Sequence, residues 1–252
     1  MSDGGTRKAR QAGYVLVAAL LLCLASSLFM MKFVPDDSYI SYRYAENLAD
    51  GHGLRFNANE QPVEAYSNLL WILLCALVFK VGLDLPTVMP VVGVLFGFGG
   101  IILLWLLLLR RGLPVLQMLF PLLILASSGP FILYEVSGME MPLFAFLLLL
   151  ILVWVDRIFS SGRLVYSLLA ALTGVLLALC RPEGILVFPV AAGYVWWASM
   201  TSRGRPGMGA PVVRHVLISL AAFVVVLAGY HVWRINYFGE WLPTPFLSKA
   251  GG

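Results

Sequence analysis

Stretches of apolar residues, each close to twenty residues long, recur along most of this chain and constrain its fold more than any other feature. A membrane-spanning helix needs about 20 predominantly apolar residues. Of the 252 residues, 60% are hydrophobic and only 12% are charged, whereas soluble domains carry about 25% charged residues. A soluble core of this size has no room for so many apolar side chains. The sequence therefore predicts an all-α, polytopic transmembrane helical bundle.

The apolar stretches predict about seven spans. Their expected limits are Tyr14–Val34, Thr87–Leu109, Pro114–Tyr134, Met141–Ile158, Leu164–Cys180, Ile185–Met200 and His215–Trp233. An eighth stretch, Leu69–Val81, is about 13 residues long and would extend only about 20 Å as a helix. We expect this short stretch to lie in the interface or to re-enter the membrane.

Charge predicts the orientation of the spans, because Lys and Arg collect in cytoplasmic loops. The N-terminal basic residues place that end in the cytoplasm, provided that the short stretch does not cross. The same orientation then places the later basic loops inside: Arg7, Lys8, Arg10, Arg110, Arg111, Arg157, Arg163, Arg203, Arg205 and Arg214. The net charge of +4 is thereby explained by topology, and no nucleic-acid module is indicated. The first stretch is too long for a typical signal-peptide core, so an uncleaved anchor in the inner (plasma) membrane is favoured over a cleaved leader.

This orientation gathers the acidic residues on the outer side. Only Asp3 and Asp156 are left inside; the outer set is Asp36, Asp37, Glu46, Asp50, Glu60, Glu64, Asp84, Glu135, Glu140, Glu183 and Glu240. Acidic residues contribute little to orientation, so their segregation suggests a site on the outer face. The three cysteines, Cys23, Cys75 and Cys180, show no metal-ligand spacing or disulfide framework, and we interpret them as small buried residues.

The first outer loop, residues 35–86, begins with two adjacent carboxylates. The stretch from Ser38 to Ala49 predicts a short amphipathic helix, capped by Asp37 or Ser38 and ended by Gly51. Such a helix can lie on the membrane surface with its tyrosines at headgroup level. Asp36 and Asp37 are either helix caps at the membrane boundary or a general base with a carboxylate that orients it.

Polar residues also precede the short apolar stretch in this loop: Glu64, Tyr66, Ser67 and Asn68. Ser67 or Asn68 can cap the following helix, or these side chains can bind a sugar through hydrogen bonds and aromatic faces. His52 lies between Gly51 and Gly53 and is interpreted as a turn residue.

Together these residues resemble a known family. The run from Asp36-Asp37-Ser-Tyr-Ile-Ser-Tyr-Arg43 to Asn57, followed by Glu64-Ala-Tyr-Ser-Asn-Leu-Leu-Trp71, is similar to the first loop of GT-C glycosyltransferases. The branch of terminal arabinofuranosyltransferases is especially similar. Three later stretches add to the resemblance: Ser137-Gly-Met-Glu140, Arg181-Pro-Glu-Gly184, and Asn236 to Pro243 with Lys249 after it. Such enzymes usually continue into further spans and an outer domain, which this chain is expected to lack, so residues 1–252 are expected to form a single transmembrane domain.

The resemblance implies an inverting enzyme that moves a sugar, arabinofuranose or a hexose, from a polyprenyl-phosphate donor to a glycan acceptor of the cell envelope. It implies that Asp36 or Asp37 is the catalytic base, with Asp36 favoured because it is nearer the span. It also implies that Arg43, Glu64, Tyr66 and Asn68 line the substrate cleft. Whether a divalent cation is required is left open.

The later stretches have structural alternatives. Arg181 or Arg234 can stabilise the leaving phosphate or simply extend to lipid headgroups. Glu140 can bind substrate or complete a capping box with Ser137, and Glu183 can bind substrate or occupy a first helical turn. A lipid-linked-sugar flippase, which needs ionisable groups within its spans, and an inactive scaffold or partner subunit are the competing functions.

Overall fold

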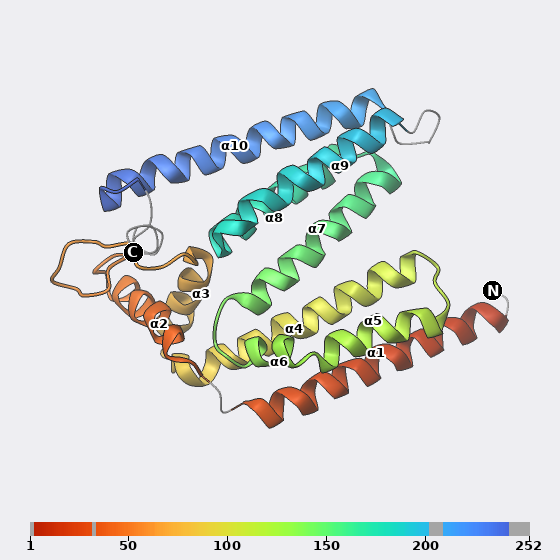
Figure 1. The fold of residues 1–252 in the computed structure, drawn as a ribbon, viewed down its shortest axis with the longest axis horizontal. Helices are drawn as coiled ribbons and strands as arrows, with labels where there is room; N and C mark the ends of the chain where they lie inside the picture. Colours follow the sequence, from red (N-terminus) through yellow and green to blue (C-terminus); the bar gives the residue numbers. More distant parts are fainter. Residues whose placement is uncertain (1–2, 32–33, 202–208, 242–252) are drawn as a thin grey trace, which may run out of the picture. The chain divides into compact units, whose positions relative to one another are not determined.

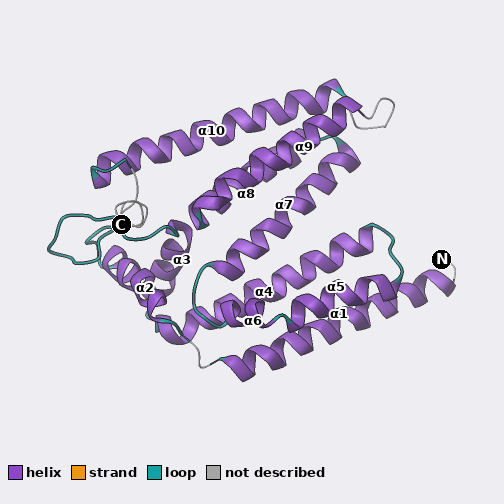
Figure 2. Cartoon of the chain, in the orientation of Figure 1, coloured by secondary structure: helices purple, strands orange, loops and turns teal. Residues whose placement is uncertain are grey.

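The computed structural model describes residues 3–31, 34–201 and 209–241, with side chains from Arg10 onward. Every regular element in these ranges is helical, and Figure 2 shows helices joined by loops. The chain divides into two compact units, residues 1–39 with 84–149 and residues 40–83 with 150–252. The all-α prediction is confirmed for the described residues.

The first unit is built on α1 (Asp3–Met30), α4 (Leu85–Arg110), α5 (Val115–Ser127) and α6 (Gly129–Glu135). In Figure 1, α1, α4 and α5 lie side by side. Their shared core consists of small and aliphatic residues: Ala12, Ala19, Cys23, Ile101, Met118, Leu122, Ala126 and Ile132. The Trp105 indole nitrogen donates to the carbonyl oxygen of Ala12 at 2.9 Å, which ties α4 to α1 by a polar contact within an otherwise apolar interface.

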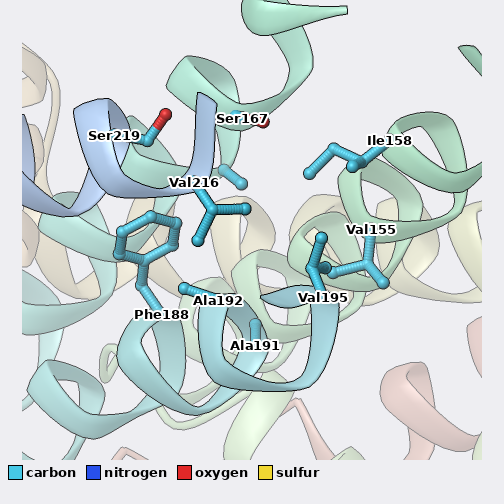
Figure 3. Close-up of a pocket in the computed structure, with 10 residues that line it drawn as sticks. Val155, Ile158, Ser167, Phe188, Ala191, Ala192, Val195, Val216 and Ser219 are labelled. Carbon is cyan, nitrogen blue, oxygen red and sulfur yellow. The ribbon is translucent and has the colours of Figure 1, made fainter. Parts of the chain in front are cut away.

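The second unit contains α3 (Leu69–Lys80), α8 (Leu164–Cys180), the 3-10 helix η1 (Pro182–Leu186), α9 (Val187–Thr201) and α10 (Ala210–Phe238). Its core is formed where α8, α9 and α10 pack on one another. The rings of Phe188 and Phe223 lie 5.0 Å apart there. A cavity of about 10 Å³ lies among the lining residues drawn in Figure 3, which include Val155, Val195 and Val216. It has room for about one water-sized sphere and for no ligand.

Two helices continue across the division in sequence: α2 (Asp36–Ala49) and α7 (Met141–Ser161). The amphipathic helix predicted after Asp37 is therefore present as α2. Its expected tyrosine placement is wrong, because Tyr42 and Tyr44 are 2% and 0% exposed and pack inside the protein. Tyr39 alone among the three tyrosines of α2 is half exposed.

In the described part of the chain, five helical segments are long and apolar enough to cross a membrane: Arg10–Met30, Leu85–Arg110, Met141–Ser161, Pro182–Thr201 and Ala210–Phe238. A sixth results if α5 and α6, which meet at a 55° bend, are one broken span. These segments indicate a multi-pass membrane protein. The expected span Leu164–Cys180 is α8, whose 17 residues lie at the short limit for a span, so the count of seven stays a prediction.

Glycines of α4 pack against neighbouring segments of the first unit. A Cβ atom at Gly97 would overlap the Glu135 carboxyl, and one at Gly99 would lie 2.9 Å from the Phe146 ring. Gly100 lines an apolar groove of about 550 Å³ beside α5 and α7. Close helix packing therefore accounts for Gly97 and Gly99, while Gly100 borders a groove.

Candidate functional site

The two predicted catalytic carboxylates occupy the first turn of α2. Asp36 and Asp37 are both exposed, and carboxylates in a first turn are stabilised by the positive end of the helix dipole. Ser38, which follows them, is 1% exposed and donates to the carbonyl oxygen of Ser137 at 2.8 Å. The start of α2 is thus fixed against the segment that leads to Glu140, while the two carboxylates remain open to solvent.

The Ser137–Glu140 segment is a buried turn. Its serine hydroxyl donates to the Tyr134 carbonyl and accepts from the Met139 backbone N–H at 3.2 Å. The capping box predicted from the sequence differs from this arrangement, because in it the backbone N–H of Glu140 would donate to the Ser137 hydroxyl. Glu140 is 3% exposed. The hydrogen bond from Ser38 to Ser137 thus joins, within the first unit, two of the sequence stretches on which the family resemblance rests.

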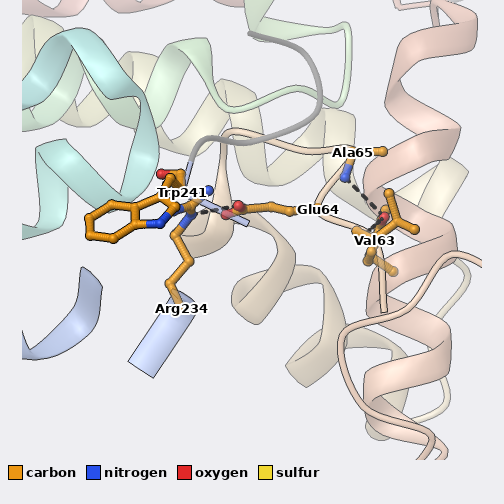
Figure 4. Close-up of polar contacts among 6 residues, drawn as sticks. Val63, Glu64, Ala65, Arg234 and Trp241 are labelled. Atoms are coloured by element: carbon orange, nitrogen blue, oxygen red, sulfur yellow. Dashed lines mark hydrogen bonds and ion pairs between the residues drawn. The ribbon is translucent and has the colours of Figure 1, made fainter. Parts of the chain in front are cut away.

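A second group of predicted residues centres on the buried guanidinium of Arg234, near the end of α10. Its Nε donates to Glu64 Oε2 at 2.5 Å and its Nη1 to the Trp241 carbonyl oxygen at 2.9 Å, as Figure 4 shows. Arg234 and Glu64 are only 3% and 5% exposed. The third nitrogen, Nη2, is buried and has no hydrogen-bond partner among the residues that the structure describes. Buried donors are rarely left unsatisfied, so this nitrogen marks a place for an acceptor.

Arg234 and Glu64 lie in the wall of a pocket of about 600 Å³ in the second unit, a volume typical of ligand sites. Its polar part also includes Tyr66, Ser67, Tyr230, His231 and Trp241. The rest is apolar and comes from α3, α8, η1 and α10: Leu69, Ala178, Leu179, Pro182, Ile185, Phe223, Val224, Leu227 and Ala228. The pocket therefore suits an amphiphile with an anionic head and a hydrocarbon chain.

The loop that carries Glu64 and Tyr66 is held by α2. The Tyr44 hydroxyl donates to the Val63 carbonyl and accepts from the Ala65 backbone N–H. The Asn68 amide nitrogen donates to Ser41 Oγ at 3.0 Å. Asn68 precedes α3, but its side chain makes no capping hydrogen bond. Asn68 thus fixes the loop to α2 and is not itself among the pocket-lining residues.

Burial alters the acidity of this loop. It raises the pKa of Glu64, although the nearby Arg234 charge and its hydrogen bond lower it in part. Burial also raises the pKa of the Tyr66 hydroxyl, for which the described residues provide no hydrogen-bond partner. Arg234 and Tyr66 both line the pocket, and each has a buried polar atom, Nη2 and Oη respectively, that is unsatisfied among the described residues.

Three predicted substrate residues lie elsewhere. Arg43 is exposed on α2, where its Nε donates to the Phe56 carbonyl at 3.2 Å and its Nη1 lies 3.7 Å from Glu46. Arg181 forms an ion pair with Glu183 at 3.2 Å. None of the three lines the pocket, although Pro182, which lies between Arg181 and Glu183, does.

Several pocket residues were not predicted from the sequence. Tyr230 and His231 precede Arg234 by four and three residues, and Leu227 by seven, so all four share one face of α10. That spacing was available as a signal. Trp241 contributes through its backbone carbonyl, which no sequence pattern marks.

Glu135 was expected at the outer rim, but its carboxyl lies inside the first unit. It accepts from Ser27 Oγ at 3.0 Å and from Cys23 Sγ at 3.2 Å, and it is fully buried. The carboxyl also lies against Gly97, the thirteenth of the 26 residues of α4. The physical reason is the bend between α5 and α6, which directs α6 and its last residue toward α1 and α4.

Within the described ranges, no group of three or more His, Cys, Asp or Glu side chains could hold a metal ion. The three cysteines are buried, as the sequence predicted. No protein-family model, curated protein or solved structure gives a significant match to this chain. The fold defines a multi-pass helical membrane protein, and the pocket adds a buried, partly unsatisfied arginine at the polar end of an apolar cavity.

Proposed function

We propose that this protein is an inverting glycosyltransferase that takes its sugar from a polyprenyl-phosphate donor and delivers it to a glycan of the cell envelope. The observation that carries the proposal is the buried Arg234 guanidinium in the wall of a largely apolar pocket, with one nitrogen that no described residue pairs. A phosphate oxygen satisfies that nitrogen, and an isoprenoid chain suits the apolar walls. The resemblance of the Asp36–Trp71 region to GT-C enzymes supports the same class.

The proposed chemistry assigns the base to the first turn of α2. Asp36 or Asp37 accepts the proton of the acceptor's hydroxyl group while the oxygen of that hydroxyl bonds to the anomeric carbon of the donor sugar. The bond from that carbon to the phosphate oxygen breaks, and the electron pair stays on the phosphate. Stabilising the charge that develops there is the role proposed for Arg181 or Arg234 from the chemistry of the guanidinium alone. Glu64 and Tyr66 are proposed to line the donor pocket and Asn68 to hold their loop, whereas substrate binding by Arg43, Glu140, Arg181 and Glu183 stays a prediction from the sequence.

The proposal includes a topology. Seven spans, with the N-terminus in the cytoplasm of a plasma (inner) membrane, put Asp36, Asp37 and the loop of residues 35–86 on the outer face. In this arrangement α5 and α6 form one broken span and α8 crosses despite its length. A cysteine introduced at the exposed Asn59 is expected to react with an impermeant maleimide in intact cells, and one at the exposed Ser161 only after permeabilisation. The opposite pattern refutes the assignment of sides.

The base is tested by replacing Asp36 and Asp37 separately with Asn and measuring transfer from a radiolabelled polyprenyl-phosphate sugar to membrane acceptors. Loss of a general base lowers the rate by roughly 10²–10⁴-fold, so one of the two variants is expected to lose activity on this scale. Asp50→Asn is the matched control, because Asp50 is exposed just beyond the other end of α2. Full activity in both test variants removes the proposed base.

A flippase for lipid-linked sugars is the second candidate, and one observation favours it. Glu135 is an ionisable residue inside the helical packing of the first unit, beside the midpoint of α4, and such residues commonly mark transport routes. Glu135→Gln is the discriminating variant. If the protein is the proposed glycosyltransferase, this variant is expected to leave sugar transfer in detergent unchanged. If the wild type shows no sugar transfer and the variant abolishes translocation of a lipid-linked sugar in liposomes, the protein is a flippase.

A further inference from the structure

An acidic side chain lies within the part of the pocket that suits an anion. Glu64 accepts from Arg234 Nε and lines the same pocket as Arg234 and Tyr66, whose Nη2 and Oη atoms have no partner within the described ranges. A pocket built only to bind negative charge would not need a buried carboxylate, because burying a charge is costly and its presence repels an anion. The pairing has a structural use, since it orients the guanidinium, but it also sets the charge of the site.

The charge of this site follows from its lining residues. Ionised Glu64 and Arg234 sum to zero, and the other titratable side chains in the lining are Tyr66, Tyr230 and His231. Tyr44, on α2, also lies near Glu64. The described lining therefore offers hydrogen-bond donors to a phosphate but, with His231 neutral, no net positive charge.

Donor and spent lipid differ in charge in the proposed reaction. The donor is a phosphodiester with one negative charge, whereas the lipid phosphate left after transfer is a monoester whose second ionisation has a pKa of about 6. The product therefore carries close to two negative charges at neutral pH. Each additional negative charge on the bound head increases its repulsion from the Glu64 carboxylate.

We propose that Glu64 is a specificity-determining residue that makes the pocket favour a lipid phosphodiester monoanion over a lipid phosphate monoester dianion. Arg234 Nη2 and Tyr66 Oη donate to the phosphate oxygens in either case, and Glu64 opposes the second charge. The role in catalysis rests on the proposed function: by disfavouring the spent lipid, Glu64 speeds its release and limits product inhibition. The charge preference itself does not depend on sugar transfer.

The preference is measured with two single-chain probes, hexadecyl phosphate and hexadecyl methyl phosphate, which differ by one methyl group and one ionisable oxygen. Binding to the purified full chain is measured in a non-ionic detergent at about pH 8, above the second ionisation of the monoester. The compared proteins are the wild type, Glu64→Gln and Glu60→Gln. The amide introduced by Glu64→Gln keeps an oxygen for Arg234 Nε but carries no charge, and Glu60 is an exposed residue of the same loop.

We expect the wild type to bind the diester more tightly than the monoester. In Glu64→Gln the monoester affinity is expected to rise by roughly tenfold, equivalent to about 1.4 kcal/mol, while the diester affinity changes less. Glu60→Gln is expected to keep the wild-type ratio. A wild type that prefers the monoester overturns the proposal without reference to any variant, and so does an unchanged ratio in a folded Glu64→Gln protein.

Two further outcomes separate the roles of Glu64. If Glu64→Gln loses affinity for both probes equally, the carboxylate only supports Arg234 and the selection proposal is wrong. If the expected ratio holds but Asp36→Asn and Asp37→Asn both keep full transfer, the charge preference stands while the proposed catalytic base falls. Failure of the inference and failure of the proposed function are thereby distinguished.

Discussion

Gly184 lies at a close approach between two backbones, and replacing it by alanine is the most direct test of the architecture around the pocket. A Cβ atom at this position would overlap the carbonyl group of Leu177 and lie 2.8 Å from the backbone nitrogen of Ala178. These atoms belong to α8 and cannot rotate away as a side chain can. Relief requires η1 to move off α8, and that movement would displace Pro182 and Ile185 from the pocket wall.

The cost can be estimated from the packing. Overpacking a core by a methyl group or more typically costs about 1–3 kcal/mol, and the fixed backbone atoms put Gly184→Ala at or above the upper end, about 3 kcal/mol. Gly193→Ala is the matched control, because a Cβ at Gly193 on α9 has no neighbour within 4 Å. The control is expected to be neutral or to stabilise by up to about 1 kcal/mol, the helix-propensity gain of Ala over Gly.

The assay is reversible unfolding of the purified protein in mixed micelles, followed by far-ultraviolet circular dichroism. Gly184→Ala is expected to unfold at a lower denaturant fraction than the wild type, and Gly193→Ala at the same fraction or a higher one. Equal stability of the two variants would refute the close seating of η1 on α8, and with it this wall of the pocket.

Three other outcomes are expected in the same unfolding assay. Tyr44→Phe removes the buried hydroxyl that holds Val63 and Ala65 and is expected to cost about 1–3 kcal/mol; wild-type stability would contradict these contacts. Ser27→Ala is expected to cost about 1 kcal/mol and Glu135→Ala about 2–4 kcal/mol, since the latter loses the hydrogen bonds and leaves a cavity; the reverse order would contradict the placement of Glu135. Burial raises the pKa of Glu64 above its ordinary value of 4.5, so its proton stabilises the fold fully below pH 4.5, and that stabilisation is lost as pH rises through the folded-state pKa. Relative to Glu64→Gln, the wild type should therefore lose free energy of unfolding as pH rises above 4.5. If the free energy of unfolding changed with pH identically in the two proteins, the raised pKa of Glu64 would be refuted.

The helices could be predicted from the sequence because apolar length and helix-ending glycines act locally. Leu164–Cys180 and the start of α7 at Met141 have the predicted limits. The 55° bend at Ser128 was not predicted, because Ser-Gly-Pro lies within a continuous apolar stretch and its geometry depends on packing against α1 and α4. The inward position of Glu135 is a consequence of that bend.

The candidate site could be predicted only in part, for a similar reason. Glu64, Tyr66 and Arg234 were selected as polar residues at the ends of apolar stretches, and all three line one pocket. The ion pair between Glu64 and Arg234 joins residues 170 positions apart, and no local sequence pattern encodes such a pairing. Arg43 was selected with them, but its side chain on α2 is exposed, and water solvates its charge without any pocket.

The pocket-lining residues of α10 also set the length of hydrocarbon chain that the pocket can contact. From Phe223 to Arg234 the helix advances 11 residues, or about 16 Å at 1.5 Å per residue. An extended hydrocarbon whose phosphate is held at Arg234 can follow α10 only over this length before it leaves the lined region. A lipid of the proposed class would therefore contact the pocket only through the first part of its chain, and tail length beyond that point should hardly matter to its recognition.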